Sequence, residues 1–486
     1  MYSKEFNSKK EFWEILKTFF INKTSQTSHT NFMKLKTRYK MFYGIGNLGY
    51  SVVSQTITNF FMFFGTSVLR VPGSLVGLAI ALATVCDAIS DPIVGYMSDN
   101  KKLGTFGFRN GYMLIGVLGI TAINILVWSV PVSYPLWLKV VWILFTLVLN
   151  EVFCSLFATP YGALSGDIVF DYNDRTVIQI YKTIFFILGM MLPSLLLNLF
   201  LPNTAQYPQG QLNPVGYRNM AIFSSVIVFV SGLICVFGTL KISKQNKVAD
   251  SSGKFSLKDI FREFGKCMKN KHQRTVVLGY SMSMISAAIL TSVGLHFFTY
   301  CLGCSSSQIT ILLSTLLVGM VVSQPVWYKL SLLDDKKPAL LIGLLVAISG
   351  IIVVMVTYLF RFRLGDISFY IMVVSIFIIG FGVGTLYSLP ASMYLDVGEY
   401  LQKEGKNNGA TFQSFLTFTY NISNAISLLV VGVLLDVIKF DPNLPVQTRP
   451  TQTGIAIVLF VGVLVSLIGS FLIFAKYKLK KKNFDK

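Results

Sequence analysis

Leu48-Gly49-Tyr50-Ser51 recurs 230 residues later as Leu278-Gly279-Tyr280-Ser281. Ser90-Asp91-Pro92 likewise returns as Ser323-Gln324-Pro325, at an offset of 233. Two further pairs keep nearly the same offset: Pro160 with Pro390, and Asp99–Lys102 with Asp334–Lys337. One short match can arise by chance, but several matches at nearly one offset indicate an internal repeat. The sequence therefore predicts two homologous halves.

Apolar segments fill most of both halves. The chain has 486 residues, 53% of them hydrophobic and 13% charged, with a mean hydropathy of +0.62. Soluble domains carry about 25% charged residues. Apolar runs of about 20 residues, the length that spans a bilayer, recur along the chain. We predict twelve spans, at roughly 42–66, 74–98, 111–131, 137–163, 180–202, 218–240, 274–300, 308–330, 338–360, 369–395, 410–437 and 454–475.

Two repeats of six spans predict the fold class. Parallel six-helix repeats with a binding site near the midplane are typical of the major facilitator fold. We therefore predict an all-α membrane protein with that fold, twelve transmembrane helices in two six-helix halves. The expected domains are a cytoplasmic N-terminal extension (1–40, or shorter if translation starts at Met33 and not Met1), two bundles (41–240 and 274–476), a cytoplasmic linker with a surface helix (241–273) and a basic tail (477–486).

The positive charge follows this topology. A net charge of +20 can indicate nucleic-acid binding, but here most of the 42 Lys and Arg residues fall in loops on one side of the predicted membrane. Cytoplasmic loops carry such an excess. We therefore expect both termini in the cytoplasm of a multi-pass cell-membrane protein, contact with the lipid bilayer, and no nucleic-acid partner.

Two acids interrupt the second span. Asp87 and Asp91 are one helical turn apart and share a helix face. Ionised carboxylates in hydrocarbon persist mainly when paired, and two close carboxylates in a low dielectric do not readily both ionise. A bound cation or proton relieves that conflict. We predict a cation site here.

Other oxygen-bearing residues extend the predicted cation site. Small hard cations take several oxygen ligands. Ser90 lies between the two aspartates, and Ser155 and Glu151 lie four residues apart in the fourth span. Glu151 has an alternative role, a structural hydrogen bond to a neighbouring helix. The ionisable membrane residues thus lie in the N-terminal half, where we expect ion coupling.

These residues resemble the glycoside–pentoside–hexuronide:cation symporter family, the melibiose permease-like group of the major facilitator superfamily. The resemblance covers about residues 40–475. It rests on the following motifs: Tyr43–Gly49, Asp87-Ala-Ile-Ser-Asp91-Pro92, Gly107–Arg109, Pro160–Leu164, Asp174-Arg175 with Tyr181-Lys182, and Ser414–Phe418. It implies sugar uptake driven by Na+, Li+ or H+ through alternating access, in a functional monomer. Asp87, Asp91 and Ser155 match the family's cation ligands.

The sugar site departs from the family. Where the resemblance implies aspartates that hold sugar hydroxyls, this chain has Ser51 and Ala158, and a stacking tryptophan is replaced by Gly162. The eleventh-span lysine aligns with Asn421, beside Tyr420. Tyr161 offers an aromatic face. We expect these six residues to line the substrate site, rebuilt for a sugar other than melibiose.

A charged group lies at the cytoplasmic ends of the spans. Asp99 and Arg109 flank the loop after the second span, and Lys182 stands where many family members carry arginine. We predict that these residues form a cytoplasmic gate. Ordinary positive-inside loop composition is the alternative explanation.

The predicted function is cation-coupled symport of a glycoside or related sugar. Two alternatives remain: a transporter of a lipid-like or other small amphiphile on the same fold, and a non-transporting sensor. An enzyme is not expected, because no nucleophile–base pair, HExxH or phosphate-binding loop is present. Cys301-Leu-Gly-Cys304 has three interpretations: a disulfide, a metal site, or two small residues near the membrane surface.

Overall fold

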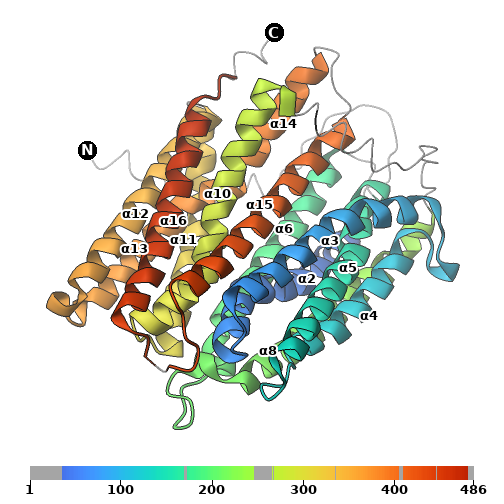
Figure 1. Cartoon of the computed structure of the whole chain (residues 1–486). Helices are drawn as coiled ribbons and strands as arrows, with labels where there is room; N and C mark the ends of the chain where they lie inside the picture. The colour runs from blue at the N-terminus through green and yellow to red at the C-terminus, as the bar shows by residue number, and fades with distance from the viewer. Residues whose placement is uncertain are drawn as a thin grey trace, which may run out of the picture. The chain divides into compact units, whose positions relative to one another are not determined.

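The computed structural model describes residues 35–168, 172–245, 265, 268–333, 335–403, 409–444 and 446–479 (Figure 1). All regular secondary structure in these ranges is helical. The elements are α2 (Thr37–Phe63), η1 (Phe64–Val68), α3 (Gly73–Asn100), η2 (Gly104–Phe106), α4 (Arg109–Val127), α5 (Leu136–Ile168), α6 (Tyr172–Leu195), α7 (Leu197–Phe200), η3 (Gly210–Leu212), α8 (Pro214–Gln245), α10 (Lys271–His296), η4 (Phe297–Cys301), α11 (Ser306–Leu333), α12 (Lys336–Leu364), α13 (Ile367–Val383), η5 (Gly384–Tyr387), α14 (Leu389–Lys403), α15 (Gly409–Val437) and α16 (Arg449–Ala475).

Helices occupy all twelve segments predicted to span the membrane. Within the described ranges, eleven helices are long and apolar enough to cross a bilayer. The twelfth, α2, is more polar, yet it packs along α6 and α8. Its polar groups have partners there: the Asn47 amide donates to the Lys182 carbonyl oxygen at 3.2 Å, and Ser51 bonds α6 as well. Polar side chains commonly join membrane helices in this way.

Each set of six helices packs together, and several contacts between helices connect the two sets. In the first set α2 packs on α6 and α8, α3 on α5, and α4 on α5 and α8. In the second, α10 packs on α16, and α13 on α11 and α12. The connecting contacts include α3 with α15, α2 with α10, and both α6 and α7 with α11. Figure 1 shows α15 running beside α3.

The flanking helices α8 and α10 extend into the two ends of the predicted linker, 241–273. α8 continues to Gln245, and α10 begins at Lys271, where the Asn270 side chain accepts hydrogen bonds from the His272 and Gln273 amides. The surface helix predicted in this linker falls largely in 246–264, outside the described residues. The domain boundaries therefore stay a prediction.

The internal repeat has structural counterparts. α2 ends in the five-residue π-helical turn η1, and α10 ends in the π-helical turn η4, which begins 233 residues after η1. Pro92 lies inside α3 and Pro325 inside α11. One pair differs: Pro160 lies within the continuous helix α5, whereas the tenth span breaks into α13, η5 and α14 just before Pro390.

The bundle has two ends. The hairpin end carries the α2–α3, α10–α11 and α15–α16 connections, and the linker end carries the α3–α4 connection and the ends of α8 and α16. Hydrogen bonds join the two sets of helices at the hairpin end: His296 Nε2 lies 2.8 Å from Thr66 Oγ1, and Gln211 Nε2 donates to Thr299 Oγ1 at 3.0 Å. The thiols of Cys301 and Cys304 are free there, so they form no disulfide.

Candidate functional site

Asp87 on α3 receives hydrogen bonds from two different helices. Ser155 on α5 donates to its Oδ1 at 2.9 Å, and the Asn421 amide on α15 donates to its Oδ2 at 3.0 Å. Both donors are neutral. The half-buried carboxylate is therefore oriented by hydrogen bonds without being neutralised, and it links the two sets of helices in mid-bundle.

Asp91 continues the same pattern one turn along α3. Thr159 on α5 donates to its Oδ1 at 2.8 Å. Ser155 and Thr159 are themselves four residues apart, so two hydroxyls on one face of α5 meet two carboxylates on one face of α3. Thr159 is not among the residues predicted from the sequence, although its spacing of four from Ser155 indicates the shared helix face.

Ser90 completes this group of oxygens. Its Oγ lies 2.6 Å from Ser155 Oγ and donates to the Asp87 backbone carbonyl at 3.1 Å. The structure thus brings together four predicted cation ligands, Asp87, Asp91, Ser90 and Ser155. Carboxylates, hydroxyls and a backbone carbonyl are the donors that small hard cations prefer.

Glu151 lies one turn before Ser155 on α5, within electrostatic range of Asp87 and Asp91. It is partly buried, and no hydrogen bond joins it to another described residue. The described residues contain no group of three or more His, Cys, Asp or Glu side chains arranged to hold a metal ion. The cluster is thus an anionic oxygen site built on two carboxylates, with Glu151 adding charge close by.

Asn421 lies in the aspartate cluster. We expected it to bind substrate, but its side-chain amide is hydrogen-bonded to Asp87. It therefore belongs to the aspartate cluster in this structure. No pattern in the sequence indicates that contact, because 334 residues separate the two side chains.

Ser51 makes a contact between α2 and α6. Its side chain is fully buried, and Oγ donates to the Phe186 carbonyl oxygen on α6 at 2.8 Å. Gly189 on α6 lies so close that a Cβ there would fall 2.8 Å from the Ser51 Cβ. The hydroxyl therefore joins α2 to α6.

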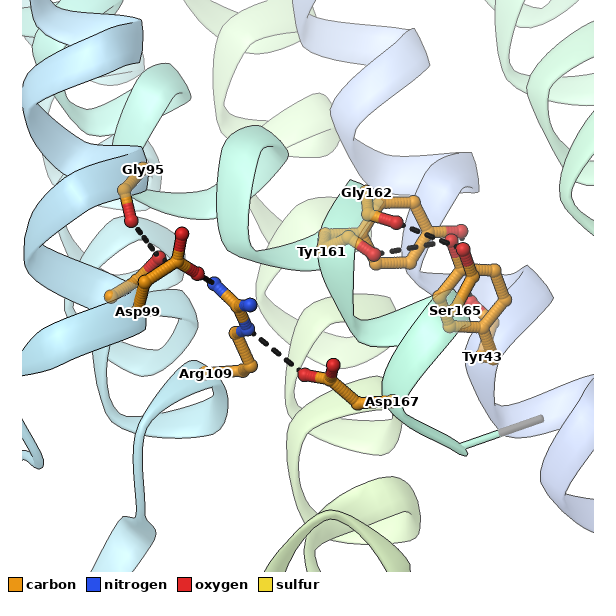
Figure 2. Close-up of polar contacts among 9 residues, drawn as sticks. Tyr43, Gly95, Asp99, Arg109, Tyr161, Gly162, Ser165 and Asp167 are labelled. Carbon is orange, nitrogen blue, oxygen red and sulfur yellow. Dashed lines mark hydrogen bonds and ion pairs between the residues drawn. The ribbon is translucent and has the colours of Figure 1, made fainter. Parts of the chain in front are cut away.

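Tyr161 is buried in an aromatic stack. Its ring lies 4.4 Å from that of Tyr43 and 5.3 Å from that of Phe157, nearly parallel to both. Figure 2 shows the reciprocal bonds between the two tyrosines: Tyr161 donates to the Tyr43 carbonyl at 3.0 Å, and Tyr43 to the Tyr161 carbonyl at 3.1 Å. Lys182 Nζ lies over the Tyr161 ring, 5.3 Å from its centroid. Tyr161 therefore supports α2 and α5 instead of offering a free aromatic face.

The remaining predicted substrate residues lie at less crowded positions. A Cβ on Gly162 would meet no atom within 4 Å, and Ala158 is half-buried. Neither has a polar side chain. Tyr420 is half-buried, and its ring lies 6.3 Å from that of Tyr280. Tyr387 is half exposed and close to both. These three tyrosines form an aromatic group in the second set of helices.

An ion cluster lies at the linker end. Arg109 contacts the carboxylate of Asp99, and its Nε donates to Asp167 Oδ2 at 3.0 Å (Figure 2). Its NH1 also donates to Ser98 Oγ at 2.9 Å. The cluster thus joins the ends of α3 and α5 to the start of α4. Sequence analysis predicted Asp99 and Arg109 but missed Asp167, and it placed Lys182 here, whereas Lys182 lies over Tyr161.

A similar ion pair occurs in the second set of helices. Lys336 Nζ at the start of α12 lies 2.7 Å from Asp396 Oδ1 and 2.6 Å from its Oδ2 on α14. Each set of helices therefore has a basic residue at the linker end that fixes the ends of neighbouring helices.

Comparison with known proteins agrees with this arrangement. The model of a family described as MFS/sugar transport protein matches residues 42–481. The putative glycoside/cation symporter YagG of Escherichia coli is 23% identical, over 92% of this chain and 93% of its own length. The sodium-dependent lysophosphatidylcholine symporter 1 of Xenopus tropicalis is 21% identical, over 93% of this chain and 89% of its own length.

A solved structure shows the same fold. The D-xylose-proton symporter superposes with a TM-score of 0.61 at 13% identity. The superposition covers 92% of this chain and 99% of the symporter. At this identity the likeness establishes the fold alone. The major facilitator arrangement predicted from the internal repeat is confirmed.

Proposed function

The chain belongs to the MFS/sugar transport protein family, and we propose that it is a symporter that couples uptake of a glycoside or related small polar sugar to a monovalent cation. One observation carries the proposal: Asp87 accepts hydrogen bonds from Ser155 on α5 and from Asn421 on α15. A charged ligand at this carboxylate would be sensed by both sets of helices.

Asp87 and Asp91 bind the coupling cation, with Ser90 and Ser155 as neutral ligands. No basic side chain of the described residues pairs with either aspartate in the hydrogen bonds and ion pairs of the site. An unneutralised charge in the bilayer costs about 3 kcal/mol or more, so a cation or proton at the site stabilises the cluster. Na+, Li+ and H+ all fit oxygen donors of this kind. Glu151 supplies additional negative charge.

Coupling runs through the contact between Asp87 and Asn421. The Asn421 amide stabilises the carboxylate when it is ionised, because a charge-assisted hydrogen bond is stronger than a neutral one. A cation that shares the carboxylate weakens that bond and changes the free energy of the α3–α15 contact. A ligand shifts a conformational equilibrium only through such differences between states. The cation and the solute together then favour the state that releases both inward.

The linker end faces the cytoplasm in this proposal, with both chain termini, and the protein acts as a monomer in the cell membrane. Positive charge concentrates there, as the positive-inside rule requires. The cytoplasmic gate consists of Asp99, Arg109 and Asp167, which fix the ends of α3, α4 and α5. The two functional domains are the six-helix bundles at 41–240 and 274–476.

The solute lies between the aspartate cluster and the tyrosines of the second bundle. Tyr280, Tyr387 and Tyr420 supply aromatic faces and hydroxyls, which suit a sugar ring. Tyr50 and Tyr420 lie within electrostatic range of Asp87 and Glu151, so ion and solute share one region. A side chain at Gly162 would meet no atom within 4 Å, so there is open space at this position of the first bundle.

A lysolipid or other amphiphile is the second candidate solute. Ser51 and Tyr161 are committed to helix packing, so few polar side chains remain in the first bundle to hold sugar hydroxyls. The name of the Xenopus relative also includes a lysophospholipid. An apolar chain could lie along Ala158 and Gly162.

Thermal stability of the purified protein, measured with sodium, lithium or neither, tests the proposal. Each condition is combined with glycosides, pentosides, hexuronides and lysophosphatidylcholine. We expect a cation-dependent rise in Tm that one sugar enlarges. A cation response enlarged only by the lysolipid would replace the sugar with an amphiphile. No response to either ion, together with uptake that is independent of pH, would refute cation coupling.

A further inference from the structure

The N-terminus of α3 has an unusual cap. Pro72 occupies the position before the helix, and its side chain makes no capping hydrogen bond. Instead, Asp436 near the end of α15 accepts hydrogen bonds from the amides of Gly73 at 2.7 Å and Ser74 at 2.8 Å. The first amides of a helix lack partners within it, and an aspartate is a favoured cap. Here the capping residue lies 363 positions away, in the other bundle.

Close backbone packing makes this contact possible. A Cβ on Gly73 would lie 2.5 Å from the Gly432 carbonyl oxygen, and a Cβ on Gly77 would lie 2.6 Å from the Leu428 carbonyl oxygen. Side chains at these positions would separate α3 from α15. The glycines therefore bring the Asp436 carboxylate within reach of the α3 amides.

The same two helices meet again at the cation site. α15 contacts α3 through Asn421 at Asp87 and through Asp436 at Gly73. Fifteen residues separate Asn421 from Asp436, about 22 Å along a helix. α3 and α15 thus share one contact that includes the cation-binding carboxylate and another at the hairpin end.

We propose that Asp436 is a positioning residue that caps α3 from the opposite bundle and holds the hairpin end of the transporter closed. Opening that end separates α3 from α15, which leaves the α3 amides without their cap and the carboxylate away from the positive end of the helix dipole. The closed state, in which Asp436 caps α3, is therefore lower in free energy than it would be without these interactions. The inference rests on the proposed alternating-access function, and it identifies a contact that sets the balance between its two states.

Spin-label distances test this role without any solute. Ser133 and Ile367 are exposed at the hairpin end, one in each bundle, and serve as labelling sites after replacement of the six native cysteines. Asp436→Ala removes both acceptors, Asp436→Asn removes the charge and keeps one acceptor, and Asp436→Glu keeps the charge. Loss of charge-assisted hydrogen bonds of this kind changes an equilibrium by about tenfold.

We expect the open-to-closed ratio to rise about tenfold in Asp436→Ala, less in Asp436→Asn and least in Asp436→Glu. Asp441→Ala is the matched control, because Asp441 accepts a bond at 2.9 Å from Asn443 in its own loop. Spin-label distances that stay unchanged in Asp436→Ala, or that shift equally in Asp441→Ala, would overturn the proposed role of Asp436. Because no sugar or cation is needed, a wrong solute assignment would leave this result intact.

Discussion

The second and eighth spans, α3 and α11, occupy equivalent positions in the repeat, yet their polar residues differ in function. In α3, Asp91 accepts a hydrogen bond from Thr159 on a neighbouring helix. Its counterpart in α11 is Gln324, which donates to the Gly384 carbonyl at 2.9 Å and to the Met320 carbonyl of its own helix at 3.1 Å. One side chain presents an accepting charge, and the other satisfies backbone carbonyls.

Neighbouring positions show the same contrast. Ser90 in α3 contacts Ser155 and the Asp87 carbonyl, whereas its counterpart Ser323 donates only within α11, to Met320. Asp87 itself corresponds to Met320. Both helices keep a proline at the matching position, so the repeat preserves the backbone while one copy has the charges. A second set of carboxylates would add the cost of desolvating more charge inside the bilayer.

The largest expected effect comes from neutralising the charged copy. Asp87→Asn or Asp91→Asn should lower cation affinity about 100-fold. Loss of one partner of a buried, hydrogen-bonded charge pair commonly costs about 2–5 kcal/mol of binding free energy. The cation-dependent rise in Tm, followed over a sodium titration, measures the affinity. Ser323→Ala in the neutral copy is the control. If the aspartate variants kept the response of the parent protein, the assignment of the ion site to α3 would be wrong.

A smaller effect should follow loss of the contact between bundles. Asn421→Ala removes the amide that donates to Asp87 and should weaken the coupling of the cation to the solute about tenfold, as expected for loss of a charge-assisted bond. Asn424→Ala, three residues along α15, is the matched control. Solute affinity is measured with and without sodium. An Asn421 variant in which sodium still strengthens solute binding as in the parent would exclude this route of coupling.

Sequence patterns were sufficient for the fold and for the grouping of the residues that we propose as the ion site. Twelve apolar runs and a repeat offset predict the bundle because bilayer thickness and helix geometry leave few alternatives. Spacing of four residues places Asp87 with Asp91, and Ser155 with Glu151, on common faces. The same rule applied to Ser155 would have included Thr159.

Contacts between distant segments could not be predicted in this way. Whether Ser51 faces a solute or α6 depends on the rotation of α2, which amphipathicity does not determine in a helix buried on most sides. Tyr161 is buried because Tyr43 stacks on it, 118 residues earlier. Asp167 and Asp436 gain their roles from helices that meet only in the folded bundle, so a local pattern does not identify them.

The smallest expected effect tests the neutral copy. Gln324→Ala removes the side-chain donor to the carbonyl of Gly384, the first residue of the 3-10 turn η5 that interrupts the tenth span. A neutral hydrogen bond contributes about 1 kcal/mol, so the free energy of unfolding should fall by about that amount and Tm slightly. Sodium affinity should stay within a factor of roughly two, because Gln324 has no contact with the aspartates. Substitutions remote from a site usually change free energies by no more than about 0.5 kcal/mol.

Gln324→Glu extends the test: it introduces a carboxylate facing the Gly384 carbonyl, which should destabilise the fold further without creating a second sodium response. A second sodium response in Gln324→Glu would mean that the repeated backbone alone suffices for an ion site, and that the hydroxyls contributed by α5 are dispensable.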